Sequence, residues 1–152
     1  MKRWLVAAVA VFALAAVIPG QPDKDLVGTW KMDASRSKFA GSGDAPALVV
    51  IKYERSGEVL RETLTVTNAG GVTTRSIDYA LNGHELANGA GDDRVVSQII
   101  SKDGVTRLQW TDDGGVFTRT IMLSADRRTM TISAHDSNPD VKSDDLIVLQ
   151  RQ

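Results

Sequence analysis

From residue 47 to the end of the chain, apolar and polar residues alternate with a period of two. This period is typical of β-strands that bury one face. Turns rich in Gly, Asn and Asp separate the alternating runs, and no run of ten or more residues has the period of an amphipathic helix. The pattern predicts a first strand over 26–32 and further strands over 47–55, 60–68, 72–81, 84–86, 95–101, 106–111, 116–123, 129–135 and 146–151.

Short, hairpin-sized connections between so many strands favour an all-β, antiparallel, up-and-down topology of about 8–10 strands. We expect the sheet to close into a barrel, because an open meander would expose edges rich in Val, Ile and Thr. A sandwich of two sheets is the alternative.

The first predicted strand, Leu26–Met32, carries a Gly-x-Trp signature. Alternation places Gly28, Trp30 and Met32 on one face. Gly28 removes side-chain bulk where a neighbouring strand or the indole approaches closely. We therefore expect Trp30 to enter the interior and to have a packing role there.

This strand carries a family resemblance. The run Gly28–Met32 resembles the opening Gly-Thr-Trp-Lys-hydrophobic strand of the calycin superfamily, which includes lipocalins and fatty-acid-binding proteins. The longer run Leu26–Phe39 looks like small exported bacterial lipocalin-like proteins, which also end on a hydrophobic strand with a basic residue and Gln, as Leu146–Gln152 does. The resemblance implies a lipocalin-like β-barrel domain over 25–152.

The resemblance also carries implications for the interior. It implies binding or transport of a small hydrophobic molecule, and an arginine stacked over the indole of Trp30, with Arg151 or Arg119 as the partner. Fatty-acid-binding proteins have a two-helix lid after the first strand, but the polar connection 33–46 is too short to hold one comfortably. A fully enclosed ligand is therefore not expected.

Three predicted strands carry a charge on their more apolar face, namely Arg119, Arg75 and Glu62. A guanidinium inside a barrel costs several kcal/mol unless it is paired and hydrogen-bonded. Apart from stacking on the indole, two explanations stay open. Arg75 and Arg119, with Tyr79, would bind the carboxylate of an apolar ligand. Alternatively, Glu62 neutralises one arginine, or a β-bulge shifts the register so that the charges face water.

Trp110 lies on a similar face, where an aromatic residue is either core or a pocket wall. The candidate ligand-binding residues are therefore Arg75, Tyr79, Arg119, Trp110 and Glu62, and the candidate residues of barrel closure are Gly28, Trp30 and Arg151.

The first 20 residues have the layout of a signal peptide. Met1-Lys2-Arg3 is positive, 4–18 is apolar without a charge, and 19–22 breaks the run. This run is too short to span a membrane comfortably, so we expect export to a periplasmic or secreted location and no span in the mature chain. Without Lys2 and Arg3 the chain has 16 basic and 19 acidic residues, a formal net charge of 16 − 19 = −3. This weakly acidic balance does not indicate a basic surface for binding nucleic acid.

Candidate catalytic chemistry is sparse in this sequence. The chain has no cysteine, its two histidines lie in no metal-ligand pattern, and nothing resembles a nucleophile elbow. Residues 136–140 match the first ligand positions of a calcium loop, but Val141 stands where Gly is needed. We therefore predict no enzyme, no metal and no cofactor.

Two functions remain on these grounds. One is a binding module for a small hydrophobic molecule, and the other is an envelope-associated structural or interaction protein with a solidly packed barrel. A cavity above about 300 Å³ would favour the first. No pattern in the sequence indicates an oligomeric state.

Overall fold

The computed structural model describes residues 22–41, 45–91, 94–112, 115–138 and 144–152. The predicted signal peptide, 1–20, lies outside the described residues, so export stays a prediction. No helix in the described part of the chain is long and apolar enough to cross a membrane.

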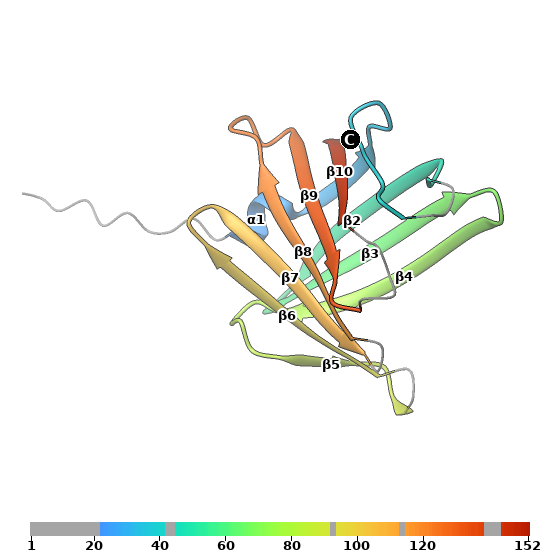
Figure 1. Cartoon of the computed structure of the whole chain (residues 1–152). Coiled ribbons are helices and arrows are strands. Elements are labelled where there is room, and N and C mark those ends of the chain that lie inside the picture. Colours follow the sequence, from blue (N-terminus) through green and yellow to red (C-terminus); the bar gives the residue numbers. More distant parts are fainter. Residues whose placement is uncertain (1–21, 42–44, 92–93, 113–114, 139–143) are drawn as a thin grey trace, which may run out of the picture.

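The described chain forms a short helix followed by strands of one antiparallel sheet (Figure 1). The strand order is β4-β3-β2-β1-β10-β9-β8-β7-β6-β5, so consecutive strands are paired except β4 and β5, and the first strand β1 also pairs with the last strand β10. The elements are α1 (Pro22–Leu26), β1 (Gly28–Met32), β2 (Leu48–Ser56), β3 (Val59–Asn68), β4 (Gly71–Ala80), β5 (Leu86–Asn88), β6 (Val95–Lys102), β7 (Val105–Asp112), β8 (Gly115–Leu123), β9 (Thr129–Asp136) and β10 (Asp144–Arg151).

The first and last strands close the sheet on one side. Trp30 pairs with Arg151 and Met32 with Leu149 across the β1–β10 ladder. The result is a nearly closed, up-and-down barrel of ten strands within the described residues, so the predicted fold class is confirmed and the sandwich is not adopted.

Three local predictions need correction. Leu26 ends α1 instead of starting β1, and the fifth strand covers 86–88 instead of 84–86. Helix α1 was not predicted at all, because five residues are too few to show a helical period. Leu26 is fully buried, and its backbone carbonyl accepts a hydrogen bond of 2.8 Å from the indole Nε1 of Trp30, so tertiary contacts hold this segment in place.

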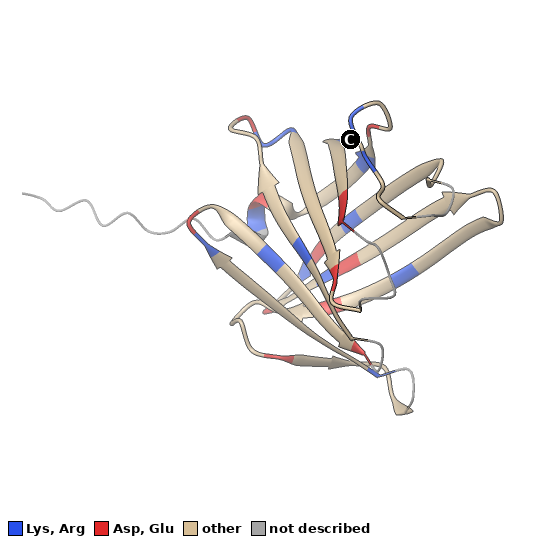
Figure 2. Ribbon diagram, in the orientation of Figure 1, with Lys and Arg blue, Asp and Glu red and all other residues tan. Residues whose placement is uncertain are grey.

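The core lies inside the barrel and is formed by the inward residues of nearly every strand. Burying each large apolar side chain contributes about 1.5–3 kcal/mol relative to exposure. The largest fully buried apolar and aromatic side chains are Leu26, Trp30, Ile51, Tyr53, Leu60, Tyr79, Leu108, Ile121, Met130, Ile132 and Leu149. Acidic and basic residues occur on many of the described strands and turns (Figure 2).

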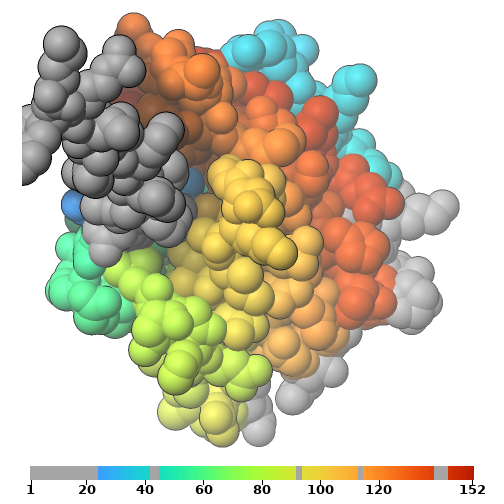
Figure 3. All heavy atoms as spheres, turned by 90° about the vertical axis from the view of Figure 1, so that its left-hand side faces the viewer, coloured from blue at the N-terminus to red at the C-terminus, as the bar shows by residue number. Residues whose placement is uncertain are grey.

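The backbone hydrogen bonding of the barrel is interrupted where β4 faces β5 and β6. No backbone ladder joins β4 to either strand among the described residues. The turn after β4 nevertheless lies against β6, where the Gln98 side chain donates to the Gly83 carbonyl at 2.9 Å. Figure 3 shows this side, with the turn and β5 in lime next to the gold of β6 and β7. We call this junction the β4–β6 seam.

Candidate functional site

One end of the barrel is closed by Trp30 and Arg151. The indole is 0% exposed, and the guanidinium carbon of Arg151 lies 4.3 Å from its ring centroid. The guanidinium donates to the backbone carbonyls of Val27 at 2.8 Å, Arg127 at 3.0 Å, and Asp25. Of the two arginines considered for this position, Arg151 occupies it.

Gly28 makes this approach feasible. A Cβ atom there would lie 2.9 Å from Nη1 of Arg151, and the backbone φ is +134°, which strains any L side chain. A glycine is thus required both by space and by backbone conformation. This arrangement closes one end of the barrel.

Arg119 instead lies deep in the barrel, paired with Glu62. Its Nη1 is 2.6 Å from Oε1 of Glu62, and the two residues are 5% and 2% exposed. The hydroxyl of Tyr53 donates to the second carboxylate oxygen at 2.6 Å. Both charges face inward, so the alternative of a shifted register does not hold for them, and Glu62 neutralises Arg119.

The two tyrosines of this cluster are held neutral by their surroundings. Burial raises the pKa of Tyr53 well above 10, and the charge of Glu62 raises this pKa further. Burial and Glu62 likewise raise the pKa of Tyr79, against the opposing effects of Arg119 and Arg75. The cluster is therefore one ion pair with two neutral phenols, and its net charge is zero.

Aromatic rings from β7 and β8 connect this cluster to the seam. Trp110 stacks on Phe117 with centroids 4.3 Å apart and planes 25° apart. The guanidinium carbon of Arg119 lies 4.8 Å from the Trp110 centroid, and that of Arg75 lies 5.6 Å from it. Trp110 thus sits between a neutralised arginine in the interior and a second arginine at the seam.

Two buried donors have no acceptor within the described residues. They are the hydroxyl of Tyr79 and the Nε of Arg119. A buried polar atom without a partner costs about 1–3 kcal/mol, so each of these two atoms calls for an explanation. We call the group of Arg119, Glu62, Tyr53 and Tyr79 the deep cluster. It therefore contains two hydrogen-bond donors that no group of the described chain accepts from.

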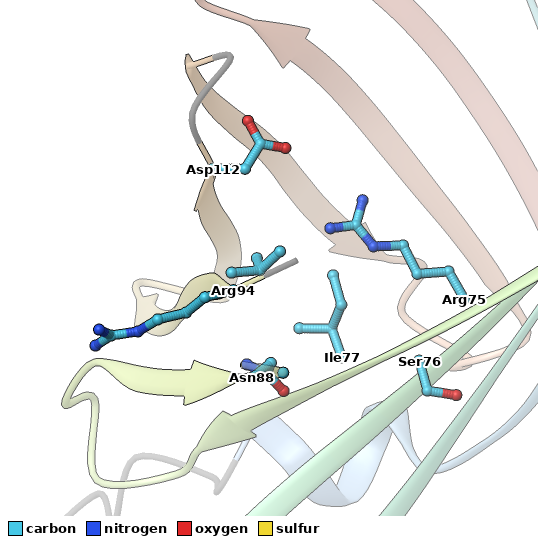
Figure 4. Close-up of a pocket in the computed structure, with 8 residues that line it drawn as sticks. Arg75, Ser76, Ile77, Asn88, Arg94 and Asp112 are labelled. Carbon is cyan, nitrogen blue, oxygen red and sulfur yellow. The ribbon is translucent and has the colours of Figure 1, made fainter. Parts of the chain in front are cut away.

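A cavity of about 430 Å³ opens at the β4–β6 seam. Figure 4 shows the guanidinium of Arg75 extending into it, while the guanidinium of Arg94 extends away from it. The cavity is lined by Arg75, Ser76, Ile77, Asn88, Gly89, Arg94, Val95 and Asp112. Of the five residues predicted to bind a ligand, Arg75 lines this cavity. Tyr79, Arg119 and Glu62 belong to the deep cluster, and Trp110 lies between this cluster and Arg75.

The seam beside the cavity is held by side chains, chiefly Asn88. Its carboxamide accepts from the backbone N–H of Asp78 at 2.7 Å and donates to the carbonyl of the same residue at 3.1 Å. Ser97 also donates its hydroxyl proton to the Asp78 carbonyl and accepts from Asn88 at 2.9 Å. The amide of Asn88 therefore takes the place that a backbone peptide of a neighbouring strand would have.

Sequence reasoning missed Asn88, because residues 87–93 have a composition typical of a turn. Alternation of apolar and polar residues indicates the faces of a strand, but it carries no signal for a single side chain that replaces a backbone ladder. The calcium-like motif lies partly in 139–143, outside the described residues. Among the residues that are described, no group of His, Asp or Glu is arranged to hold a metal.

The fold resembles several solved structures. A mutant of the fluorescent protein UnaG superposes with a TM-score of 0.55 at 15% identity, covering 85% of this chain and 97% of that one. A secretory abundant heat soluble protein from Ramazzottius varieornatus gives 0.62 at 10%, with coverages of 84% and 96%. A fatty-acid-binding protein from brain tissue of Drosophila melanogaster gives 0.52 at 16%, with 82% and 98%.

These likenesses show that the chain shares the up-and-down barrel fold of these proteins. At such low identity they define the fold alone. No family model and no curated protein sequence matches the chain.

Proposed function

We propose that this protein binds a small, largely hydrophobic molecule in its barrel, at the cavity of the β4–β6 seam. The observation that carries the proposal is the cavity itself, because about 430 Å³ lies within the range of about 300–1,000 Å³ that is usual for ligand pockets. The cavity lies at the β4–β6 seam, where no backbone ladder closes the described barrel.

Further support comes from the groups around the cavity. Ile77 and Val95 supply an apolar wall, and Arg75 extends into the space between β4 and β7 (Figure 4). One of the structural neighbours is a fatty-acid-binding protein by name, which fits a barrel of this type with a binding role.

The role we propose is binding without catalysis. The buried Arg119–Glu62 pair and its tyrosines form a neutral cluster, and none of these groups is poised as a free acid, base or nucleophile. We further propose that the protein is exported, on the basis of its leader-like residues 1–20. Sequencing the N-terminus of protein recovered outside the cytoplasm would test the export.

Native mass spectrometry of the purified full chain tests the binding role, since a copurified small molecule adds a defined mass. In parallel, the neutral probe N-phenyl-1-naphthylamine should gain fluorescence on binding. Val95→Phe places a larger side chain in the cavity and should reduce the probe signal. Val72→Phe is the matched control, because Val72 is an exposed residue away from the cavity.

Absence of any bound mass, together with no probe signal from wild type, would contradict the proposal. That result would favour the alternative of a structural or interaction protein with no ligand. A probe signal that Val72→Phe lowers as much as Val95→Phe would place the binding elsewhere on the molecule.

A further inference from the structure

Strand β4 has a free edge over the first half of its length. One side of β4 pairs with β3 along Gly71–Ala80, and no strand pairs with its other side among the described residues. Residues 71–76 are all exposed, whereas 77–80 are buried or partly buried. In Figure 1, β4 is the outer strand of the group β2–β4 on the right. An edge strand with unpaired backbone groups is a template for pairing with another strand.

Two hydrogen-bond arrangements show which backbone groups of β4 face this edge. The N–H of Leu81 donates to the carbonyl of Glu58, just before β3, at 2.9 Å. Asp78 faces the opposite way, because its N–H and its carbonyl both bond to the side chain of Asn88 at the seam. In an antiparallel ladder both backbone groups of a residue point to the same side, and successive residues alternate between the two sides. Even-numbered residues of β4 therefore point away from β3.

Three exposed residues of β4 consequently present unpaired backbone groups. The N–H and carbonyl groups of Val72, Thr74 and Ser76 point to the free edge, since the β3–β4 register is regular along the whole strand. Natural edge strands are usually protected by Pro, Lys, a β-bulge or a covering segment. The run 71–76 has no proline and no bulge, and Arg75 is its only charged residue. This edge can therefore accept a further strand.

We infer that this further strand is β4 of a second copy of the chain, paired antiparallel about a two-fold axis at Thr74. In this arrangement Thr74 faces Thr74 of the partner subunit, and Val72 faces Ser76 of the partner subunit. Each facing pair exchanges two backbone hydrogen bonds, so every free group of the edge is satisfied. A two-fold axis makes the edge its own complement, as in other symmetric dimers. The inference concerns assembly and does not depend on ligand binding.

Charge and pairing both favour an axis at Thr74 over the neighbouring positions. An axis at Arg75 would place two guanidinium groups directly opposite each other, which is unfavourable. An axis at Thr73 would leave the backbone groups of Ser76 without a partner, because the facing position would lie before the start of β4. With the axis at Thr74, Arg75 faces Thr73 of the partner subunit, and no like charges are opposed.

The expected dimer is weak, because its interface is small. Only the stretch 72–76 pairs on each side, and interfaces that bury less than about 1,200 Å² belong mostly to transient complexes. We therefore expect a dissociation constant between about 10 µM and about 1 mM. At the low micromolar concentrations that suit a ligand-binding assay the chain is then mainly a monomer.

Sedimentation equilibrium of the full chain over this concentration range tests the association. Thr74→Pro removes the N–H at the two-fold axis, and the monomer tolerates it because this N–H does not bond to β3. The variant should weaken the dimer at least about tenfold, since one hydrogen bond is lost from each copy and the proline ring blocks the close approach. Thr74→Val is the matched control, because it keeps the N–H, and it should stay within about threefold of wild type.

Introduced thiols test the register, because the chain has no cysteine of its own. Thr74→Cys places two thiols on facing residues whose Cα atoms lie about 5.5 Å apart, within the roughly 4.4–6.8 Å that a disulfide spans. Ser76→Cys is the control on the same edge, since its two copies lie four positions apart along the strands, roughly 13 Å. Mild oxidation at a concentration where wild type associates should link Thr74→Cys chains at least about tenfold faster than Ser76→Cys chains.

Each outcome supports or overturns the inference. Wild type that remains monomeric at about 1 mM would overturn it. A Thr74→Pro variant that is folded by circular dichroism and associates as tightly as wild type would show that another surface is used. Equal rates of linking for Thr74→Cys and Ser76→Cys would refute the axis at Thr74. If Thr74→Pro does not fold, the comparison of the two cysteine variants decides.

Discussion

Replacing Arg151 by Met should destabilise the barrel strongly, although the residue is the last but one of the chain. The substitution keeps an unbranched side chain over the indole of Trp30 and removes the guanidinium. Three hydrogen bonds to backbone carbonyls and the cation–π contact at 4.3 Å are lost together. These contacts join β10 to the segment before β1 and to the turn between β8 and β9. Their loss therefore loosens the closure of the barrel.

The expected magnitude follows from those contacts. A hydrogen bond from a charged group contributes about 1.5–3 kcal/mol, and a cation–π contact about 0.5–2 kcal/mol. The side chain of Arg151 is only partly buried, which favours the lower ends of these ranges, and new packing by Met recovers part of the loss. We expect the free energy of unfolding to fall by about 3–5 kcal/mol, a large share of the roughly 5–15 kcal/mol that is usual for a domain.

Equilibrium unfolding in urea, followed by tryptophan fluorescence, measures this change. Arg127→Met is the control, because Arg127 pairs with Asp25 at 3.1 Å in the same corner but both side chains are about half exposed. Such a surface pair contributes about 0–1 kcal/mol. A loss below about 1 kcal/mol for Arg151→Met, or one equal to that of the control, would refute the role assigned to this arginine.

Three other predictions concern single positions. Gly28→Ala should cost about 1–3 kcal/mol in unfolding free energy, because the methyl group meets Arg151 at 2.9 Å and the backbone has φ +134°; a neutral effect in urea unfolding would contradict both causes. Asn88→Ala should speed hydrogen exchange of the Asp78 amide, since its only acceptor at the seam is lost, and should lower stability by about 1–3 kcal/mol; unchanged exchange would mean that another group holds the seam. Tyr53 keeps its proton in the folded barrel at a pH where the unfolded chain has lost it, so the stability it contributes is present below about pH 10 and declines above it, by about 1.4 kcal/mol per pH unit. Unfolding measured at about pH 9 and pH 11 should show a shallower decline for Tyr53→Phe than for wild type, and equal slopes would refute this linkage.

Much of the architecture could be predicted from sequence because it depends on local pattern. The period of two identified each strand to within about two residues and placed Glu62 and Arg119 on inward-facing sides. The Gly-x-Trp run at Gly28 and Trp30 indicated the first strand of a closed barrel. Turn composition set the hairpins and hence the up-and-down order.

The partners of the inward charges could not be predicted in the same way. Arg119 and Glu62 are separated by 57 positions, and Arg151 and Val27 by 124. Which residues meet across a barrel depends on the stagger of all the strands between them, which no local window contains. Three explanations for the arginines were open from the sequence. In the structure Arg151 covers Trp30 at one end of the barrel, Arg119 is neutralised by Glu62, and Arg75 lies at the β4–β6 seam.

The amino-acid sequence by itself determined the strands, their inward faces and the presence of a buried indole, because these follow from periodicity and from the side chains of one segment. Only the tertiary structure decided that Arg151 covers that indole, that Glu62 removes the charge of Arg119, and that Asn88 bridges the seam beside a cavity. The physical reason is that burial is a property of one strand, whereas pairing depends on the register of ten strands as they curve toward closure.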